Sequence, residues 1–344
     1  MVRSLVKNLL EMAVRASHAR HANPTIPKSP LPALPPIVLG TGHLPGLYKR
    51  WRFPRNARAD AVLDAALEAG CNAFDTARVY GEGLSESLLG NWIRSRRVRD
   101  QVVVIGKGGH PDSSGRSRVD PTALTEDLDL TLRSLRVEFV DLYMLHRDDL
   151  DLGVGLIMET LHTFVQAGKV AAIGASNWTH ARIEEANIYA AERGLTPFAA
   201  SSPHQSLAEM ISVPWPGCLS LTGDAGAEAR AWYAATQMPV LAWSPLAGGY
   251  LLKQEGNARA CSGPYDSPAN AVRRERLHAL AARRGSSPAQ LALAFLLHQE
   301  MKVVPVVAAS TPARVRELLA ASAVKLSIDE RDWLDLRANG NGPT

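Results

Sequence analysis

An aspartate and a tyrosine stand five positions apart in the segment Gly70 to Gly90, GCNAFDTARVYGEGLSESLLG. Asp75 follows a short apolar run typical of the end of a buried strand, and Tyr80 lies in the glycine-containing loop after it. A phenol beside a carboxylate at the end of a strand indicates an acid held for proton transfer. Because the pKa of an unperturbed tyrosine is about 10, a nearby cation is needed to make it an effective acid at neutral pH.

Two other polar residues also follow apolar runs. Lys107 comes after Val102–Ile105 and before two glycines, so we expect it to pair with Asp75 and to lower the pKa of Tyr80. His146 follows another apolar run and is placed to donate a hydrogen bond to the oxygen that receives the proton. These four residues are the predicted catalytic group.

Eight short apolar runs alternate with amphipathic stretches from residue 36 onward. The expected strands are residues 37–41, 72–75, 102–107, 140–146, 171–176, 198–202, 240–244 and 303–307. The expected helices are residues 57–69, 85–95, 121–135, 154–167, 181–193, 227–235, 271–284 and 312–321. Short apolar strands that do not alternate suit a parallel sheet covered by helices, and eight of them predict a single closed (β/α)8 TIM barrel.

The alternative fold is a doubly wound open sheet. That fold usually carries GxGxxG after its first strand, whereas residues 39–43 read LGTGH. In a barrel the polar groups that follow the strands converge on one face, and Ser176 and Asn177 after the fifth strand join that set. The segment 203–226, rich in proline, glycine and serine, is expected to form a surface loop over the barrel mouth.

The composition excludes several classes of protein. The 344 residues are 46% hydrophobic and 21% charged, which suits one large enzyme domain. The net charge of +4 is spread along the chain, so no nucleic-acid partner is expected, and no apolar run is long enough to span a membrane. The three cysteines, Cys71, Cys218 and Cys261, lie far apart, so we expect neither disulfides nor structural zinc.

Residues 1–35 differ from the rest of the chain, because five basic residues precede position 30 with Glu11 as their one acidic neighbour. We interpret them as an N-terminal extension, a short helix or disordered tail, before a barrel domain at residues 36–344. A cytoplasmic location follows from this interpretation, and the alternative is an organelle transit peptide.

Several segments, taken in order, resemble the signatures of the aldo-keto reductase family over residues 36 to 336. They are GCN at 70–72, DTA at 75–77, YG at 80–81, SE at 85–86, LG at 89–90, VIGK at 104–107, DLYMLH at 141–146, IGASN at 173–177, WSPLAGG at 243–249 and VPV at 304–306. The resemblance implies hydride transfer between a nicotinamide cofactor and the carbonyl of an aldehyde, ketone or sugar, without metal or flavin. It implies that Tyr80 protonates the carbonyl oxygen, that Lys107 and Asp75 tune it, and that His146 orients the carbonyl.

The resemblance also implies where the nicotinamide lies. Ser176 and Asn177 would hold its carboxamide, and Trp243 would stack on the ring where the family more often has tyrosine. Ser202 stands where many members carry a glutamine for the same carboxamide. These contacts are expectations carried by the resemblance.

The rest of the cofactor is expected nearer the end of the chain. The diphosphate would lie near Ser244 and Leu246, and backbone donors around residues 310–311 would meet the adenosine end. Arg314 matches an arginine that contacts the 2′-phosphate, which favours NADPH over NADH, although Leu318 replaces the usual asparagine near adenine. The full expected cofactor set is Gly40, Thr41, Asp75, Ser176, Asn177, Ser202, Trp243, Ser244, Leu246, Ser310, Thr311, Arg314 and Glu317.

Two other functions stay open at this point. One is an NADPH-binding regulatory or interaction subunit with little turnover. The other is a metal-dependent barrel hydrolase that uses Asp75, His146 and Asp148 as ligands. A small-molecule carbonyl compound is the expected partner, and the sequence predicts no oligomeric state.

Overall fold

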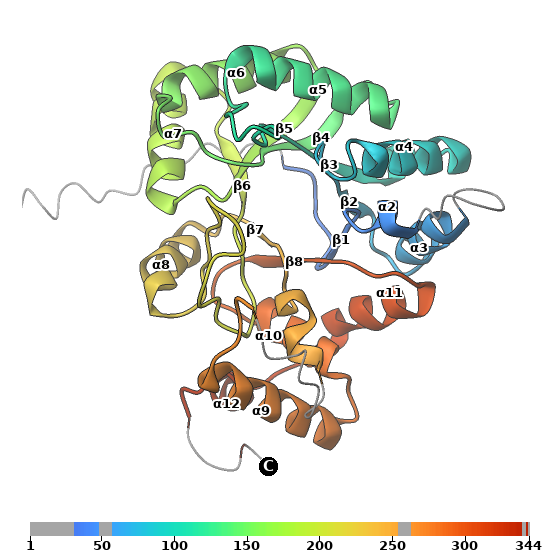
Figure 1. The fold of residues 1–344 in the computed structure, drawn as a ribbon, viewed down its shortest axis with the longest axis vertical. Coiled ribbons are helices and arrows are strands. Elements are labelled where there is room, and N and C mark those ends of the chain that lie inside the picture. The colour runs from blue at the N-terminus through green and yellow to red at the C-terminus, as the bar shows by residue number, and fades with distance from the viewer. Residues whose placement is uncertain (1–30, 48–56, 254–262, 339–341, 343–344) are drawn as a thin grey trace, which may run out of the picture.

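Eight parallel strands form a closed barrel, and the helices lie around it (Figure 1). The computed structural model describes residues 31–47, 57–253, 263–338 and 342. Strands neighbour one another in chain order, and the first pairs with the last through Val38–Val306 and Leu39–Val307. The (β/α)8 TIM barrel is therefore confirmed. The doubly wound alternative is wrong, since such a sheet leaves two open edges.

Each strand begins and ends within one residue of its expected bounds, except that the seventh ends two residues early, at Ala242. The strands are β1 Val38–Gly40, β2 Ala73–Asp75, β3 Val103–Gly108, β4 Val140–Leu145, β5 Val170–Ser176, β6 Phe198–Ser202, β7 Val240–Ala242 and β8 Val303–Val307. Their residues are almost all buried, because the barrel interior covers one face and the helices cover the other. This burial on both faces explains the continuous apolar runs in the sequence.

The eight expected helices are all present. They are α3 Ala57–Glu68, α4 Leu84–Arg96, α5 Pro121–Leu135, α6 Val154–Gln166, α7 His180–Arg193, α8 Ala227–Thr236, α9 Pro268–Arg284 and α11 Pro312–Leu319. Asp120 caps α5 by accepting hydrogen bonds from the amides of Thr122 and Ala123. Gly194 ends α7 in the left-handed conformation, with φ 66°. The capping side chain of Asp120 and the left-handed glycine at position 194 thus determine where these two helices begin and end.

The described residues include three more α-helices: α2 Leu44–Leu47, α10 Pro288–Leu297 and α12 Ile328–Leu334. For α10 the sequence predicts the beginning, a cap at Ser287 followed by Pro288, but not the extent of the helix. α10 begins with a capping box in which Ser287 and Gln290 exchange hydrogen bonds. Nearly every residue after that first turn is buried, because α10 packs against β8, α9 and α11. A helix covered on all sides shows no polar stripe, so its periodicity does not predict it.

Two layers of apolar side chains build the core. The barrel interior is filled by Val38, Ala73, Val103, Ile105, Leu142, Met144, Ala172, Ala200, Leu241 and Val304. The second layer lies between the sheet and the helices, where for example Phe74 packs edge-on against Trp92 with ring centroids 5.1 Å apart. The interior is therefore a packed plug and not a channel.

The segment 203–226 is only partly the surface loop that we expected. Residues 203–208 are buried, and His204 forms isolated bridges to Ser220 and Trp243. Residues 211–217 form its longest exposed stretch, and residues 224–225 are exposed as well. The first residues of this segment thus pack against the barrel, whereas its tip lies at the surface.

Of the helices that the structure describes, none has the length and apolar character needed to cross a membrane. The predicted extension at residues 1–35 falls largely outside the described residues, as do Trp51 and Cys261.

Candidate active site

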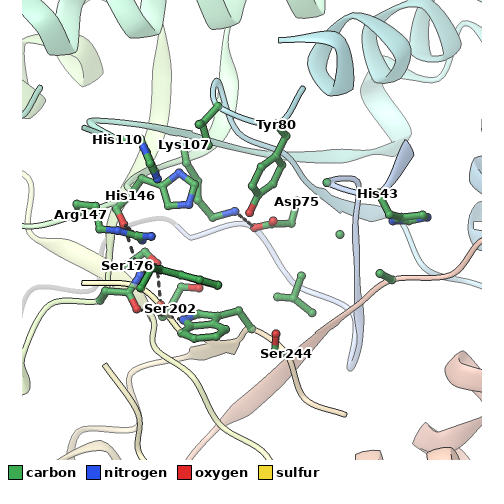
Figure 2. Close-up of a pocket in the computed structure, with 18 of the residues that line it drawn as sticks. His43, Asp75, Tyr80, Lys107, His110, His146, Arg147, Ser176, Ser202 and Ser244 are labelled. Atoms are coloured by element: carbon green, nitrogen blue, oxygen red, sulfur yellow. Dashed lines mark hydrogen bonds and ion pairs between the residues drawn. The ribbon is translucent and has the colours of Figure 1, made fainter. Parts of the chain in front are cut away.

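The polar side chains of the site lie one layer above the interior core. Alternate residues of a strand share a face, so a residue two positions beyond a core residue also points into the barrel. Asp75, Lys107, His146, Ser202 and Trp243 each stand two positions beyond a residue of the interior cluster. The strand ends therefore bring these side chains together at the carboxyl-terminal mouth of the barrel (Figure 2).

Asp75 and Lys107 form a buried ion pair between β2 and β3. The ammonium of Lys107 donates to Oδ2 of Asp75, and the two side chains are 4% and 5% exposed. Burial by itself would lower the pKa of Lys107, but the Asp75 carboxylate and the Tyr80 phenol outweigh it, so the pKa is raised and the lysine stays charged. Burial also raises the pKa of Asp75, and Lys107 opposes that rise.

Tyr80 points its hydroxyl toward this ion pair (Figure 2). The Nζ atom of Lys107 lies 5.4 Å from the centroid of its ring. Gly42 leaves room for the ring, since a Cβ there would lie 3.3 Å from two ring carbons of Tyr80. The expected lowering of the Tyr80 pKa is wrong as a net result. Burial raises the pKa of Tyr80, and the positive charge of Lys107 offsets only part of that rise.

His146 stands beside Tyr80, with the two rings edge-on and their centroids 5.7 Å apart. The ring of His110 lies 5.0 Å away on another side. Burial, aided by the charges of Lys107 and Arg147, holds the pKa of His146 well below its usual range, so the imidazole is neutral. A neutral imidazole carries one N–H, and its buried Nδ1 has no hydrogen-bond partner within the described structure.

These side chains line a cavity of about 760 Å³. Its lining residues are Gly40, Gly42, His43, Asp75, Val79, Tyr80, Lys107, His110, Pro111, Gly115, His146, Arg147, Ser176, Asn177, Ser202, Trp215, Pro216, Trp243, Ser244, Val306, Val307 and Ala308. This volume is in the range of small-molecule sites. All four predicted catalytic residues line this cavity. Six expected cofactor residues besides Asp75 also line it: Gly40, Ser176, Asn177, Ser202, Trp243 and Ser244.

One wall joins an aromatic face to amide and hydroxyl groups. The indole N–H of Trp243 donates to Oδ1 of Asn177 at 3.2 Å, and Nδ2 of Asn177 donates to Oγ of Ser176 at 3.0 Å. Ser202 and Ser176 donate their hydroxyl protons to the backbone carbonyls of Leu241 and Ser202, respectively. These contacts fix the orientation of the Trp243 ring at the mouth of the barrel.

The other expected cofactor residues lie away from the cavity lining. The hydroxyl of Thr41 is buried and donates to the Asp75 carbonyl at 2.9 Å, so it holds the strand end. Leu246 packs against the outer core. Farther along the chain, Thr311 caps α11, and Arg314 pairs with Glu317 at 2.6 Å. Ser310 is exposed just before that cap.

The sequence predicts a substrate pocket built from the loops near residues 43–54, 109–119 and 203–226 and from the C-terminal tail. His43, His110 and Trp215 of the three loops line the cavity. Trp215 stacks on Trp243 with centroids 5.5 Å apart. Arg147 also lines the cavity and is 9% exposed, although the sequence HRDD at 146–149 is equally compatible with a solvated turn. The available signal was its place directly after His146, at the end of an inward-facing strand.

The metal-hydrolase alternative needs three ligands in one place. Across the described residues, no three His, Cys, Asp or Glu side chains gather so that they could hold a metal ion. Asp148 instead accepts two hydrogen bonds from Arg182 of α7, at 2.9 and 3.1 Å. Cys71 is no nucleophile either, because burial raises the pKa of its thiol to about 11.

The sequence that carries these strand-end residues is similar to those of known proteins. The model of the aldo/keto reductase family matches residues 36–336. The chain belongs to that family. Members act on small-molecule carbonyl compounds with NAD(P)H, and this family member is an oxidoreductase.

Individual relatives carry reductase names. Norsolorinic acid reductase of Emericella nidulans is 30% identical over 86% of this chain and 76% of its own length. A 6-dehydroglucose reductase of Novosphingobium aromaticivorans is 30% identical over 87% of this chain and 94% of its own. An aldo-keto reductase of Alternaria alternata is 28% identical, and the match covers 80% of each chain.

Proposed function

We propose that this protein is an NADPH-dependent carbonyl reductase in which Tyr80 is the proton donor. One observation carries the proposal: the hydroxyl of Tyr80 meets the buried Asp75–Lys107 pair beside a neutral His146, inside a cavity of small-molecule size. The reduced nicotinamide supplies the hydride for the carbonyl carbon. The residues of the chain supply the proton and hold the substrate.

Each catalytic side chain has a separate task. Tyr80 gives its proton to the carbonyl oxygen as negative charge develops there. Lys107 then stabilises the phenolate, since its raised pKa keeps the ammonium charged at neutral pH. His146, held neutral by burial, donates one hydrogen bond to the carbonyl oxygen and adds no second charge. Asp75 keeps the ammonium in place.

The cavity wall supports the cofactor assignment. A flat ring with an amide group fits against Trp243, whose indole is fixed by Asn177, with the hydroxyl of Ser176 close by. The lining continues along the end of β8 through residues 306–308. It leads toward the amino-terminal end of α11, where backbone N–H groups favour phosphate.

Arg314 supports the choice of NADPH. It lies in the first turn of α11 and is 30% exposed, so an incoming 2′-phosphate can reach it. Its guanidinium now pairs with Glu317, and a phosphate that carries more charge would compete for it. Glu317 is then free to bind elsewhere on the adenosine.

Turnover by purified protein tests the proposal. We expect NADPH oxidation, followed by its absorbance, with aldehydes and ketones that include aryl aldehydes and oxidised sugars. The sugars are suggested by the dehydroglucose reductase among the relatives. In Tyr80→Phe the rate should fall by at least about 10²-fold.

NADPH binding is the matched measurement for Tyr80→Phe. Its dissociation constant should stay within about twofold, because only a hydroxyl at the reacting carbonyl is removed. Unchanged turnover in Tyr80→Phe would refute the proton-donor role. A wild-type protein that binds NADPH but reduces no compound of the panel would favour the regulatory-subunit alternative.

A further inference from the structure

Arg147 places a positive charge in the cavity that the proposed reaction does not use. Its side chain lines the cavity directly after His146, and the residue is 9% exposed. Burial lowers the pKa of its guanidinium, but an arginine remains protonated in proteins. A buried charge without a counter-ion is costly, so this one points to a ligand.

Neighbouring acids in the sequence do not neutralise Arg147. Asp148 is held by Arg182, and Oδ1 of Asp149 accepts the backbone N–H of Asp151 at 3.0 Å. Within the described residues, the guanidinium of Arg147 makes one hydrogen bond, from Nη1 to the His146 carbonyl at 2.8 Å, and no acidic side chain pairs with it. Several of its N–H donors therefore remain for a ligand.

The other charged groups of the cavity do not neutralise the charge of Arg147 either. Asp75 is the only acid among the described lining residues, and its carboxylate is bound to Lys107. His146 is neutral. The cavity therefore carries one net positive charge at Arg147, which attracts an anion into a site of low dielectric constant.

The surroundings of Arg147 suit an organic anion. The guanidinium lies 5.8 Å from the ring centroid of Trp215, and the stem passes under Gly217, where an added Cβ would lie 3.7 Å from Cδ. In the view of Figure 2, His146 lies between Arg147 and Tyr80. A compound whose carbonyl faces Tyr80 can thus reach Arg147 with a group at its other end, and its carbon skeleton can contact Trp215.

We propose that Arg147 binds a carboxylate on the carbonyl substrate, so that the preferred substrates are oxo-acids and formyl-acids. This inference rests on the reductase function proposed above. The planar guanidinium suits a carboxylate because it can donate two parallel hydrogen bonds. Arg147 is therefore a specificity-determining residue, distinct from the four residues around the reacting oxygen.

Matched substrates test this role. The pairs are 4-carboxybenzaldehyde with 4-formylbenzamide and the corresponding 3-isomers, because acid and amide have nearly the same shape. Wild-type enzyme should prefer the acid in at least one pair. In Arg147→Gln the acid-to-amide ratio of kcat/KM should fall by about 10- to 100-fold, the range of a lost charge-assisted hydrogen bond. A ratio cancels any general loss of activity.

Two control variants accompany this test. Arg116→Gln removes the same charge from an exposed arginine of the 109–119 loop and should leave the ratio unchanged. Arg147→Lys keeps the charge without the planar fork, so its ratio should lie between those of the wild type and Arg147→Gln. An unchanged ratio in Arg147→Gln overturns the inference. Equal losses for acid and amide, with a raised KM for NADPH, also overturn it and place Arg147 at the cofactor diphosphate.

A binding measurement separates this inference from the reductase proposal. Benzoate and benzamide are titrated into the protein with NADP present, and tryptophan fluorescence reports binding near Trp215. Benzoate should bind more tightly, and Arg147→Gln should abolish the difference. This result holds even for a protein that reduces no carbonyl compound tested. Equal binding of benzoate by wild type and variant would overturn the carboxylate site alone.

Discussion

Replacing Lys107 by methionine leaves the Asp75 carboxylate buried without its counter-ion. Both side chains are at most 5% exposed, and removing one partner of such a pair costs about 3–5 kcal/mol of the free energy of unfolding. Asp75→Asn should cost a similar amount, since it leaves the ammonium unpaired. The double variant carries neither charge, so its loss should be smaller than the sum of the two single losses by about 3 kcal/mol or more.

Urea unfolding followed by tryptophan fluorescence measures these differences. Lys169→Met is the matched control, because Lys169 and Asp129 are 40% and 37% exposed and their 2.8 Å pair should be worth at most about 1 kcal/mol. Activity should be lost in Lys107→Met and should not return in the double variant, because Tyr80 still lacks its cation. Additive losses, or a Lys107→Met cost as small as that of the control, would refute the buried pair.

The same variant has a pH signature with a definite sign. Without Lys107, nothing opposes the burial that raises the pKa of Asp75 in the folded protein. A carboxyl whose folded pKa exceeds its unfolded value binds more protons in the folded state, so stability increases as the pH falls through the folded pKa. The deficit of Lys107→Met relative to the wild type should therefore shrink toward acidic pH.

Three further predictions concern the cofactor, a buried histidine and helix packing. Arg314→Ala should lower the NADPH-to-NADH ratio of kcat/KM by about 10-fold or more, and Glu317→Ala should raise it; equal effects on both cofactors would contradict a 2′-phosphate contact. Burial lowers the pKa of His204 to about 3, so between about pH 6.5 and pH 3 this histidine is protonated in the unfolded state and neutral in the folded state. In His204→Gln the slope of the unfolding free energy against pH should therefore drop over this range by up to about 1.4 kcal/mol per pH unit. An unchanged slope would show that the histidine is charged in the native protein. Gly90→Ala should destabilise the protein by at least about 1–3 kcal/mol, because its Cβ would lie 2.1 Å from a backbone oxygen of α5; Gly46→Ala, with open space, is the control for thermal unfolding.

The positions of the eight strands were predictable because each is a short and mostly apolar run. The barrel places the residue two positions after a core residue on the same face, and this rule also identifies Asp75, Lys107 and His146. Hydrophobic patterns in the sequence do not reveal a helix that is buried on every side. α10 carried a readable cap at Ser287, but its remaining residues have no polar stripe to reveal a helix.

Charge and burial at the site depended on contacts between distant segments. The sequence His146–Asp149 resembles a solvated charged turn, because two acids follow Arg147 directly. Arg182 of α7 donates hydrogen bonds to the carboxylate of Asp148, so this carboxylate does not pair with Arg147. The pKa of Tyr80 also depends on contacts between distant segments. The sequence predicted that Lys107 would lower this pKa, but it did not predict the burial that raises the pKa by more.

The segment 203–226 joins a fixed base to an exposed tip. His204 is hydrogen-bonded to Ser220 at 2.9 Å and to Tyr265 at 3.1 Å, and its ring packs against Trp243. The exposed residues 211–217 include Trp215, which faces the substrate cavity. The length and side chains of the tip can therefore vary, and with them the shape of the cavity, while the anchored base keeps Trp243 in place.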